Sequence, residues 1–177
     1  MSIQILSDLH LEIFAGYDTH EITPTAPYLA LLGDIGTFGK HEAEVLEFLT
    51  RQLRLFRVVF FVPGNHEAYR TTWDNTIAAL ERFGRHAEEL DESHGKFVLL
   101  NRRSFSIPER NLIVLGCSLF SEIQRDKKSI IRARLNDFYH TDDWDCETHN
   151  TAHMKEAKSA ALLGQTSQMS HVLNLPK

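Results

Sequence analysis

Short apolar runs that stop at polar residues dominate the first third of the chain. They predict strands over Ile3–Leu6, Tyr28–Leu32 and Val58–Val62, and the first is apolar apart from Gln4, as expected of a strand buried on both faces. Between the second and third strands, apolar positions recur every three or four residues over residues 40–56, which predicts a helix. A strand, a helix and a strand in succession predict parallel pairing of the two strands.

The pattern changes further along the chain. A second apolar stripe predicts a helix over residues 72–90, and three short strands are predicted over residues 97–100, 104–107 and 112–115. Residues 121–148 mix aromatic and acidic side chains, which we interpret as an irregular segment over the site described next. The tail is expected to contain a helix capped by Gly164.

Polar side chains that can bind metals follow each of the first three strands. Asp8 and His10 follow the first strand, Asp34 the second, and Asn65 and His66 the third. Because the carboxyl ends of parallel strands meet at one edge of a sheet, these side chains are expected to converge. If the turn after the first strand stays extended, Asp8 and His10 share a face and reach a single ion. Taken alone, this pair is also compatible with a turn aspartate and a surface histidine.

Three motifs in this order resemble the calcineurin-like metallophosphoesterase family: Asp8-Leu9-His10, Gly33-Asp34 and Gly64-Asn65-His66-Glu67. The resemblance covers about residues 1–150 and implies an α/β fold, a sandwich of two mixed sheets flanked by helices, with a two-metal site at the strand ends. It also divides the chain into the N-terminal part of a phosphoesterase domain, residues 1–150, and a divergent helical or irregular tail, residues 151–177.

The resemblance further implies hydrolysis of phosphate monoesters or diesters by a dinuclear centre and a metal-bound hydroxide. Asp34 would bridge two ions, Asp8 and His10 would hold one, and Asn65 would offer its amide oxygen to the other. Two cations roughly 3.5–4 Å apart neutralise the phosphoryl group and lower the pKa of a bridging water. The mixed nitrogen and oxygen donors suit Mn, Fe, Zn or Ni better than Mg.

Two neighbours of Asn65 in the third motif have different expected roles. By the same resemblance, His66 is the catalytic residue, which would orient the phosphate or give a proton to the leaving alkoxide. The alternative for His66 is a histidine at the start of a helix. Glu67 is interpreted as an acid at a helix N-terminus, with a catalytic role as the alternative.

The later part of the chain departs from the family pattern. The family's remaining ligands are histidines of a TH pair after another apolar strand and of a GHxH motif, and neither pattern occurs here. The later histidines that could substitute are His140, His149, His153 and His171; His149 and His153 are four apart and could share a helix face. We therefore expect a C-terminally truncated phosphoesterase that holds one ion well and the second weakly, with impaired catalysis.

Three hypotheses follow for function. The chain is a two-metal phosphoesterase with reduced activity, a non-catalytic binding module or truncated gene product that keeps the fold, or an unrelated α/β domain. The 19 basic and 24 acidic residues form no block of like charge, so nothing indicates nucleic-acid binding, and the expected partner is a phosphorylated small molecule or another phosphoester.

Cysteine content and apolar runs bear on the compartment. Cys117 and Cys146 lack CxxC spacing, so neither a disulfide framework nor a zinc site is expected. A basic leader and an apolar run of about 18 residues are absent from the sequence, which predicts a soluble cytoplasmic protein without a membrane partner.

Overall fold

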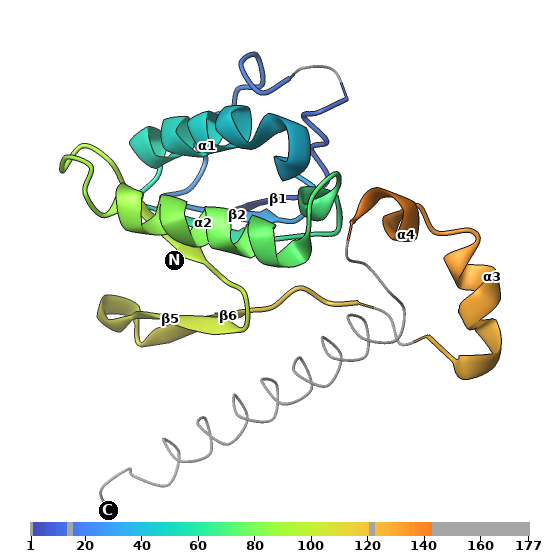
Figure 1. Cartoon of the computed structure of the whole chain (residues 1–177). Helices are drawn as coiled ribbons and strands as arrows, with labels where there is room; N and C mark the ends of the chain where they lie inside the picture. The colour runs from blue at the N-terminus through green and yellow to red at the C-terminus, as the bar shows by residue number, and fades with distance from the viewer. Residues whose placement is uncertain (1, 14–15, 121–122, 143–177) are drawn as a thin grey trace, which may run out of the picture.

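A parallel four-stranded sheet is the centre of the computed structural model, which describes residues 2–13, 16–120 and 123–142. Its strands, in spatial order, are β1 (Ile3–Leu6), β2 (Tyr28–Leu32), β3 (Val58–Val62) and β4 (Lys96–Leu99). Helices α1 (Phe38–Leu55) and α2 (Trp73–Ala87) cover one face, and the antiparallel strands β5 (Arg103–Ile107) and β6 (Leu112–Gly116) lie on the other (Figure 1). The predicted α/β class with two sheets is confirmed, but among the described strands neither sheet is mixed, because all pairings in the larger sheet are parallel and the one in the smaller sheet is antiparallel.

Five short helical turns complete the described part of the chain. They are η1 (His66–Ala68), η2 (Pro108–Arg110), η3 (Arg125–Lys127), α3 (Lys128–Arg132) and α4 (Asp137–His140). The segment predicted to be irregular over residues 121–148 therefore contains three of these turns within its described residues. Residues 143–177, including the predicted tail helix, lie outside the described residues.

Parallel registers bring the ends of the first three strands to one edge of the sheet. Leu6 pairs with Leu31, and Leu32 pairs with Val62, so the loops that follow β1, β2 and β3 leave the sheet side by side. The predicted bounds of these three strands and their parallel pairing are confirmed. This edge is where ligands bind in open α/β sheets.

Alternating side chains divide the core between the two faces of the sheet. Leu31 and Phe61 belong to the larger cluster, which includes buried side chains of α1 and α2. Phe60 belongs to the second cluster and meets Phe105 of β5 edge to face, with ring centroids 5.5 Å apart. Each fully buried Leu or Phe contributes about 1.5–3 kcal/mol, so packing on both faces holds the strand ends firmly.

Strand β1 is less buried than its apolar sequence predicts. Ile5 is 61% exposed, so the expectation of a strand buried on both faces is wrong. β1 lies at the edge of the sheet, where among the described strands it pairs with β2 alone. Phe105 and Ile107 of β5 pack against Tyr28 of β2 and Phe60 of β3.

Helix α1 starts two residues earlier than the pattern predicts. Gly39 lies in the first turn of α1, before the predicted start at residue 40, and a Cβ there would collide with the carbonyl group of Arg70. The glycine therefore permits close packing of the chain after η1 against the helix. Helix α2 follows Thr72, whose side chain accepts a hydrogen bond from the backbone N of Asn75 at 3.1 Å, and ends three residues before the predicted end.

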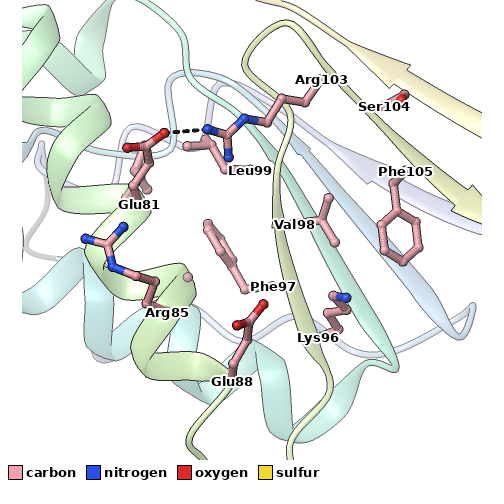
Figure 2. A pocket seen from close by; sticks show the side chains of 12 residues that line it. Glu81, Arg85, Glu88, Lys96, Phe97, Val98, Leu99, Arg103, Ser104 and Phe105 are labelled. Carbon is pink, nitrogen blue, oxygen red and sulfur yellow. Dashed lines mark hydrogen bonds and ion pairs between the residues drawn. The ribbon is translucent and has the colours of Figure 1, made fainter.

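A surface pocket lies between α2, β4 and β5 (Figure 2). Phe97 and Leu99 are among its apolar lining, and Arg103 and Glu81 form an ion pair at 2.6 Å beside it. None of the residues predicted for the metal site lines this pocket. Among the described residues, no helix is both long and apolar enough to cross a membrane.

Candidate metal centre

The loop after β1 is tied by backbone hydrogen bonds to the loop after β2. The N–H of Asp8 donates to the carbonyl of Gly33, and the N–H of His10 donates to the carbonyl of Asp34, each at 3.0 Å. As a result, one potential ligand atom of each of Asp8, His10 and Asp34 lies within 4.8 Å of the others. The structure thus brings together three of the four predicted ligands in a group that could hold an ion.

The backbone at these three residues is left-handed. The φ angles are 56° at Asp8, 47° at His10 and 55° at Asp34. The turn is therefore not extended, and the geometric reason given for the pairing of Asp8 with His10 is wrong even though the side chains meet. Such conformations cost about 1–3 kcal/mol each and cluster at functional sites.

Two glycines allow the loops after β2 and β3 to approach each other. Gly33 has a φ of 83°, and a Cβ on it would lie 2.9 Å from the Cα of Gly64. A Cβ on Gly64 would collide with the Asp34 carboxylate and lie 2.7 Å from the Asp34 backbone N. Both positions therefore require glycine if the Asp34 side chain is to keep its place.

Gly64→Ala is expected to weaken Mn²⁺ binding by at least about 10-fold, because the new methyl group displaces the Asp34 carboxylate. Isothermal titration calorimetry on the folded variant measures this loss. Gly84→Ala is the matched control. Gly84 lies within α2, and a Cβ there makes only an ordinary 3.5 Å contact with Phe97. Equal Mn²⁺ affinity in the two variants would contradict the placement of Asp34 in the centre.

Glu12 is a member of the site that the sequence interpretation missed. Its Oε1 lies 3.0 Å from Nδ1 of His66 and 3.4 Å from Nδ1 of His10, and the two imidazole rings are 4.4 Å apart. His10, Glu12 and His66 form a second group that could hold an ion. A signal was present in the sequence, because Asp8, His10 and Glu12 alternate with leucines and so continue the motif by one step.

The donors present fit a divalent cation. Imidazole nitrogens and carboxylate oxygens are ordinary ligands of Mn, Fe and Zn. Within the described part of the chain, Glu12 Oε2 is buried without a hydrogen-bond partner, which is costly for a carboxylate unless a positive charge compensates it. The two groups share His10, so they are alternative descriptions of one region and not two independent sites.

Asn65, the fourth predicted ligand, precedes His66 in the third motif, and its side chain hydrogen-bonds to two residues outside these groups. Its Nδ2 donates to Asp137 Oδ1 at 2.8 Å and to the hydroxyl of Tyr69 at 3.2 Å, and that hydroxyl donates to the same Asp137 oxygen at 2.6 Å. Burial and the Asp137 carboxylate raise the pKa of Tyr69 well above its usual range, so the hydroxyl stays protonated.

The later histidines do not join either group in the described residues. The ring of His140 lies 5.1 Å from that of Tyr69, and His140 belongs to neither of the groups that could hold an ion. His149, His153 and His171 lie outside the described residues.

Glu67 is fully buried beneath the loops that carry the predicted ligands. Its Oε2 accepts from the backbone N–H of Gly64 at 2.7 Å and of Asp34 at 3.0 Å, and its Oε1 accepts from that of Ile35 at 2.8 Å. Burial, reinforced by the Asp34 charge, raises the pKa of Glu67 to about 7, against the lowering effect of these amides. Glu67 does lie in the first turn of η1, as interpreted from the sequence, but its carboxylate also joins two site loops, which the sequence did not predict.

This arrangement, with acids and histidines gathered at the carboxyl edge of a parallel sheet, is that of a metallophosphoesterase-type fold. A family model for calcineurin-like phosphoesterases matches residues 1–155, and the chain belongs to this family. Over 147 residues the chain is 25% identical to the uncharacterized protein L509 of Acanthamoeba polyphaga mimivirus. The matched region covers 77% of this chain and 50% of that protein.

A solved structure is similar to the chain in fold. It is the crystal structure of the phosphopantetheinyl hydrolase PptH from Mycobacterium tuberculosis, with a TM-score of 0.60 and 16% sequence identity over 99% of this chain and 64% of that one. The chain therefore spans about half the length of the curated relative and less than two thirds of the solved one.

Proposed function

We propose that the chain carries the N-terminal half of a metal-dependent phosphoesterase centre, which hydrolyses phosphate monoesters or diesters. The main supporting observation is the group of Asp8, His10 and Asp34, whose potential ligand atoms lie within 4.8 Å of one another at the carboxyl edge of the sheet. When bound, divalent cations supply charge neutralisation of the phosphoryl group and activation of water. Membership of the calcineurin-like phosphoesterase family supports the same reaction class.

Asp34 is positioned to serve as the central carboxylate of this centre. Its Oδ1 accepts from the backbone N–H of His66 at 3.1 Å, and its backbone N–H donates to the buried Glu67. Asp34 is therefore held both at its carboxylate and at its backbone N–H in the absence of a bound ligand. Such fixed orientation reduces the reorganisation needed at the moment of reaction.

His66 is the proton donor in this proposal, and Glu12 orients it. In the doubly protonated ring, Nδ1–H donates to Glu12 at 3.0 Å and stays in place, whereas the proton on Nε2 passes to the leaving alkoxide, so that His66 ends as neutral imidazole. The ring is also stacked on Tyr69, with centroids 4.2 Å apart, which restricts its rotation.

The second cation has fewer donors among the proposed ligands. Asp8, His10 and Asp34 serve one ion, whereas Asp34 and Asn65 alone serve the other. We therefore expect one ion to be held well and the second weakly, so that catalysis by this chain alone is impaired. The competing candidate, a binding module that keeps the fold without turnover, shares the first ion and differs only in the absence of hydrolysis.

The role of His66 is tested by comparing leaving groups in excess Mn²⁺. His66→Gln should lower hydrolysis of an alkyl phosphate by about 10²-fold, because an alkoxide needs a proton, and lower that of p-nitrophenyl phosphate much less. His86→Gln, with a side chain 68% exposed on α2, is the control. Equal losses on the two esters would limit His66 to orienting phosphate, and a wild-type chain without Mn²⁺-dependent turnover would favour the binding module.

A further inference from the structure

The orientation of the Asn65 carboxamide is fixed by a residue far along the chain. The Nδ2 group donates to Asp137 Oδ1 at 2.8 Å and to the hydroxyl oxygen of Tyr69 at 3.2 Å. Only the NH₂ end of a carboxamide can donate to a carboxylate, so chemistry assigns which end is which. Oδ1 must then lie on the other arm of the carboxamide, away from Asp137.

Asp137 is itself held in place independently of Asn65. It belongs to α4, which is fastened to the chain after η1 by two backbone hydrogen bonds, from Arg70 N to His140 O at 2.6 Å and from Asp142 N to Thr71 O at 3.0 Å. Phe138 packs against the small apolar cluster of Ala68 and Trp73. Figure 1 shows α4 next to the edge of the sheet where η1 lies, with α3 farther out.

We propose that Asp137 is a positioning residue, which turns the Asn65 carboxamide so that its oxygen faces the metal centre. This rests on the proposed function, in which Asn65 Oδ1 is a ligand of the more weakly held ion. A cation binds the carbonyl end of a carboxamide and is repelled by the NH₂ end. An unrestrained side chain presents either end, whereas one that donates to Asp137 and Tyr69 presents only oxygen.

The proposal also gives α4 a role in the centre. Asn65 of the third motif, Tyr69 at the C-cap of η1 and Asp137 of α4 are joined pairwise by hydrogen bonds. Asn65 donates to Tyr69 and to Asp137, and Tyr69 donates to the same oxygen of Asp137. Residues that hydrogen-bond to metal ligands fix the orientation of those ligands, and their loss lowers metal affinity by about 10–100-fold. The segment after β6 therefore completes the orientation of a ligand that precedes it by 72 residues.

Two measurements on the full chain test this proposal. In the metal-free protein, Asp137→Ala should move the side-chain NH₂ signals of Asn65 in a ¹H–¹⁵N spectrum away from their wild-type positions, because a charge-assisted hydrogen bond is lost. In a Mn²⁺ titration followed by electron paramagnetic resonance, it should weaken the second ion by about 10–100-fold and change the first by less than about twofold.

Matched variants separate positioning from folding. Asp142→Ala removes an exposed carboxylate from the same segment and should match wild type in both measurements. Asp137→Asn keeps the size and one acceptor oxygen, so it should lose less second-ion affinity than Asp137→Ala. If Asp137→Ala perturbs folding, Asp137→Asn and Tyr69→Phe carry the test, and both should move the Asn65 signals.

The proposal and the proposed function fail in different ways. Asn65→Ala with unchanged Mn²⁺ binding would contradict Asn65 as a ligand and hence the proposed centre. Asp137→Ala and Asp137→Asn with wild-type Asn65 signals would overturn the positioning role. It would equally be overturned if Asn65→Ala weakened the second ion and Asp137→Ala did not, or if Asp137→Ala weakened both ions to the same extent.

Discussion

Asp34→Asn is expected to lower Mn²⁺-dependent phosphoester hydrolysis by about 10³-fold or more, equivalent to about 4 kcal/mol of transition-state stabilisation. In the proposed centre Asp34 is the one residue that serves both ions, so the substitution removes a negative charge from each of them. The asparagine keeps an oxygen that can accept from His66 N, as Asp34 Oδ1 does at 3.1 Å, so the loop should keep its conformation. Steady-state kinetics in excess Mn²⁺ measures the loss.

Two controls decide whether that loss reports chemistry. Asp74→Asn changes an exposed aspartate in the first turn of α2 and should keep wild-type activity. The melting temperature of Asp34→Asn without metal should stay close to that of the wild type. An Asp34→Asn enzyme that retained a tenth of wild-type turnover would contradict the assignment of Asp34 as the shared carboxylate.

Glu67→Gln is expected to lower the free energy of unfolding by about 2–5 kcal/mol, because at least two buried amides lose their acceptor. Both carboxylate oxygens of Glu67 accept two backbone N–H groups, from Ile35 and Gly36 on one side and from Asp34 and Gly64 on the other. A glutamine places an NH₂ group against one of these sets whichever way it turns. Chemical denaturation of the metal-free protein measures the change.

Glu47→Gln is the matched control for Glu67→Gln, since Glu47 is exposed on α1. It should change the free energy of unfolding by less than about 0.5 kcal/mol. Activity of Glu67→Gln should fall together with stability, because the loops that carry Asp34 and Asn65 separate. A Glu67→Gln protein as stable as Glu47→Gln would show that Glu67 does not join these loops in solution.

Local patterns in the sequence were sufficient to predict the sheet edge. The strands ending at Leu6, Leu32 and Val62 are continuous apolar runs bounded by motif residues, so their bounds and parallel pairing are those predicted. The start of α1 was harder to predict, because a glycine ordinarily indicates a turn, whereas Gly39 is required by the close contact with Arg70. Edge exposure of β1 depends on which strands neighbour it, which a single run of residues does not encode.

Contacts between distant segments explain what the sequence interpretation missed. Three carboxylates form hydrogen bonds with residues distant in sequence. Glu12 and His66 are separated by 54 positions, Glu67 and Ile35 by 32, and Asp137 and Asn65 by 72. Glu12 continues the first motif and Glu67 ends the third, whereas Asp137 lies in no motif, and the role of each carboxylate follows only from the partner that the fold brings to it. The predicted ligands, in contrast, each follow a strand directly, which is why position alone placed Asp8, His10 and Asp34 at the same edge.

The division of the chain into residues 1–150 and 151–177 stays a prediction. The family model ends at residue 155, and residues 143–177 lie outside the described part of the structure. The ligand roles of Asp8, His10, Asp34 and Asn65, and the catalytic role of His66, are likewise proposals.

Metal content of the folded protein tests the central claim most directly. Purified chain is loaded with excess Mn²⁺, passed through gel filtration in metal-free buffer and analysed by elemental mass spectrometry, beside Asp8→Ala and the exposed control Asp74→Asn. The proposed centre predicts about one retained ion per chain in the wild type and in the control, and much less in Asp8→Ala, because Asp8 is a proposed ligand of the tightly held ion. Folded wild-type protein that retains no Mn²⁺, or an Asp8→Ala variant that retains as much as the wild type, would contradict it.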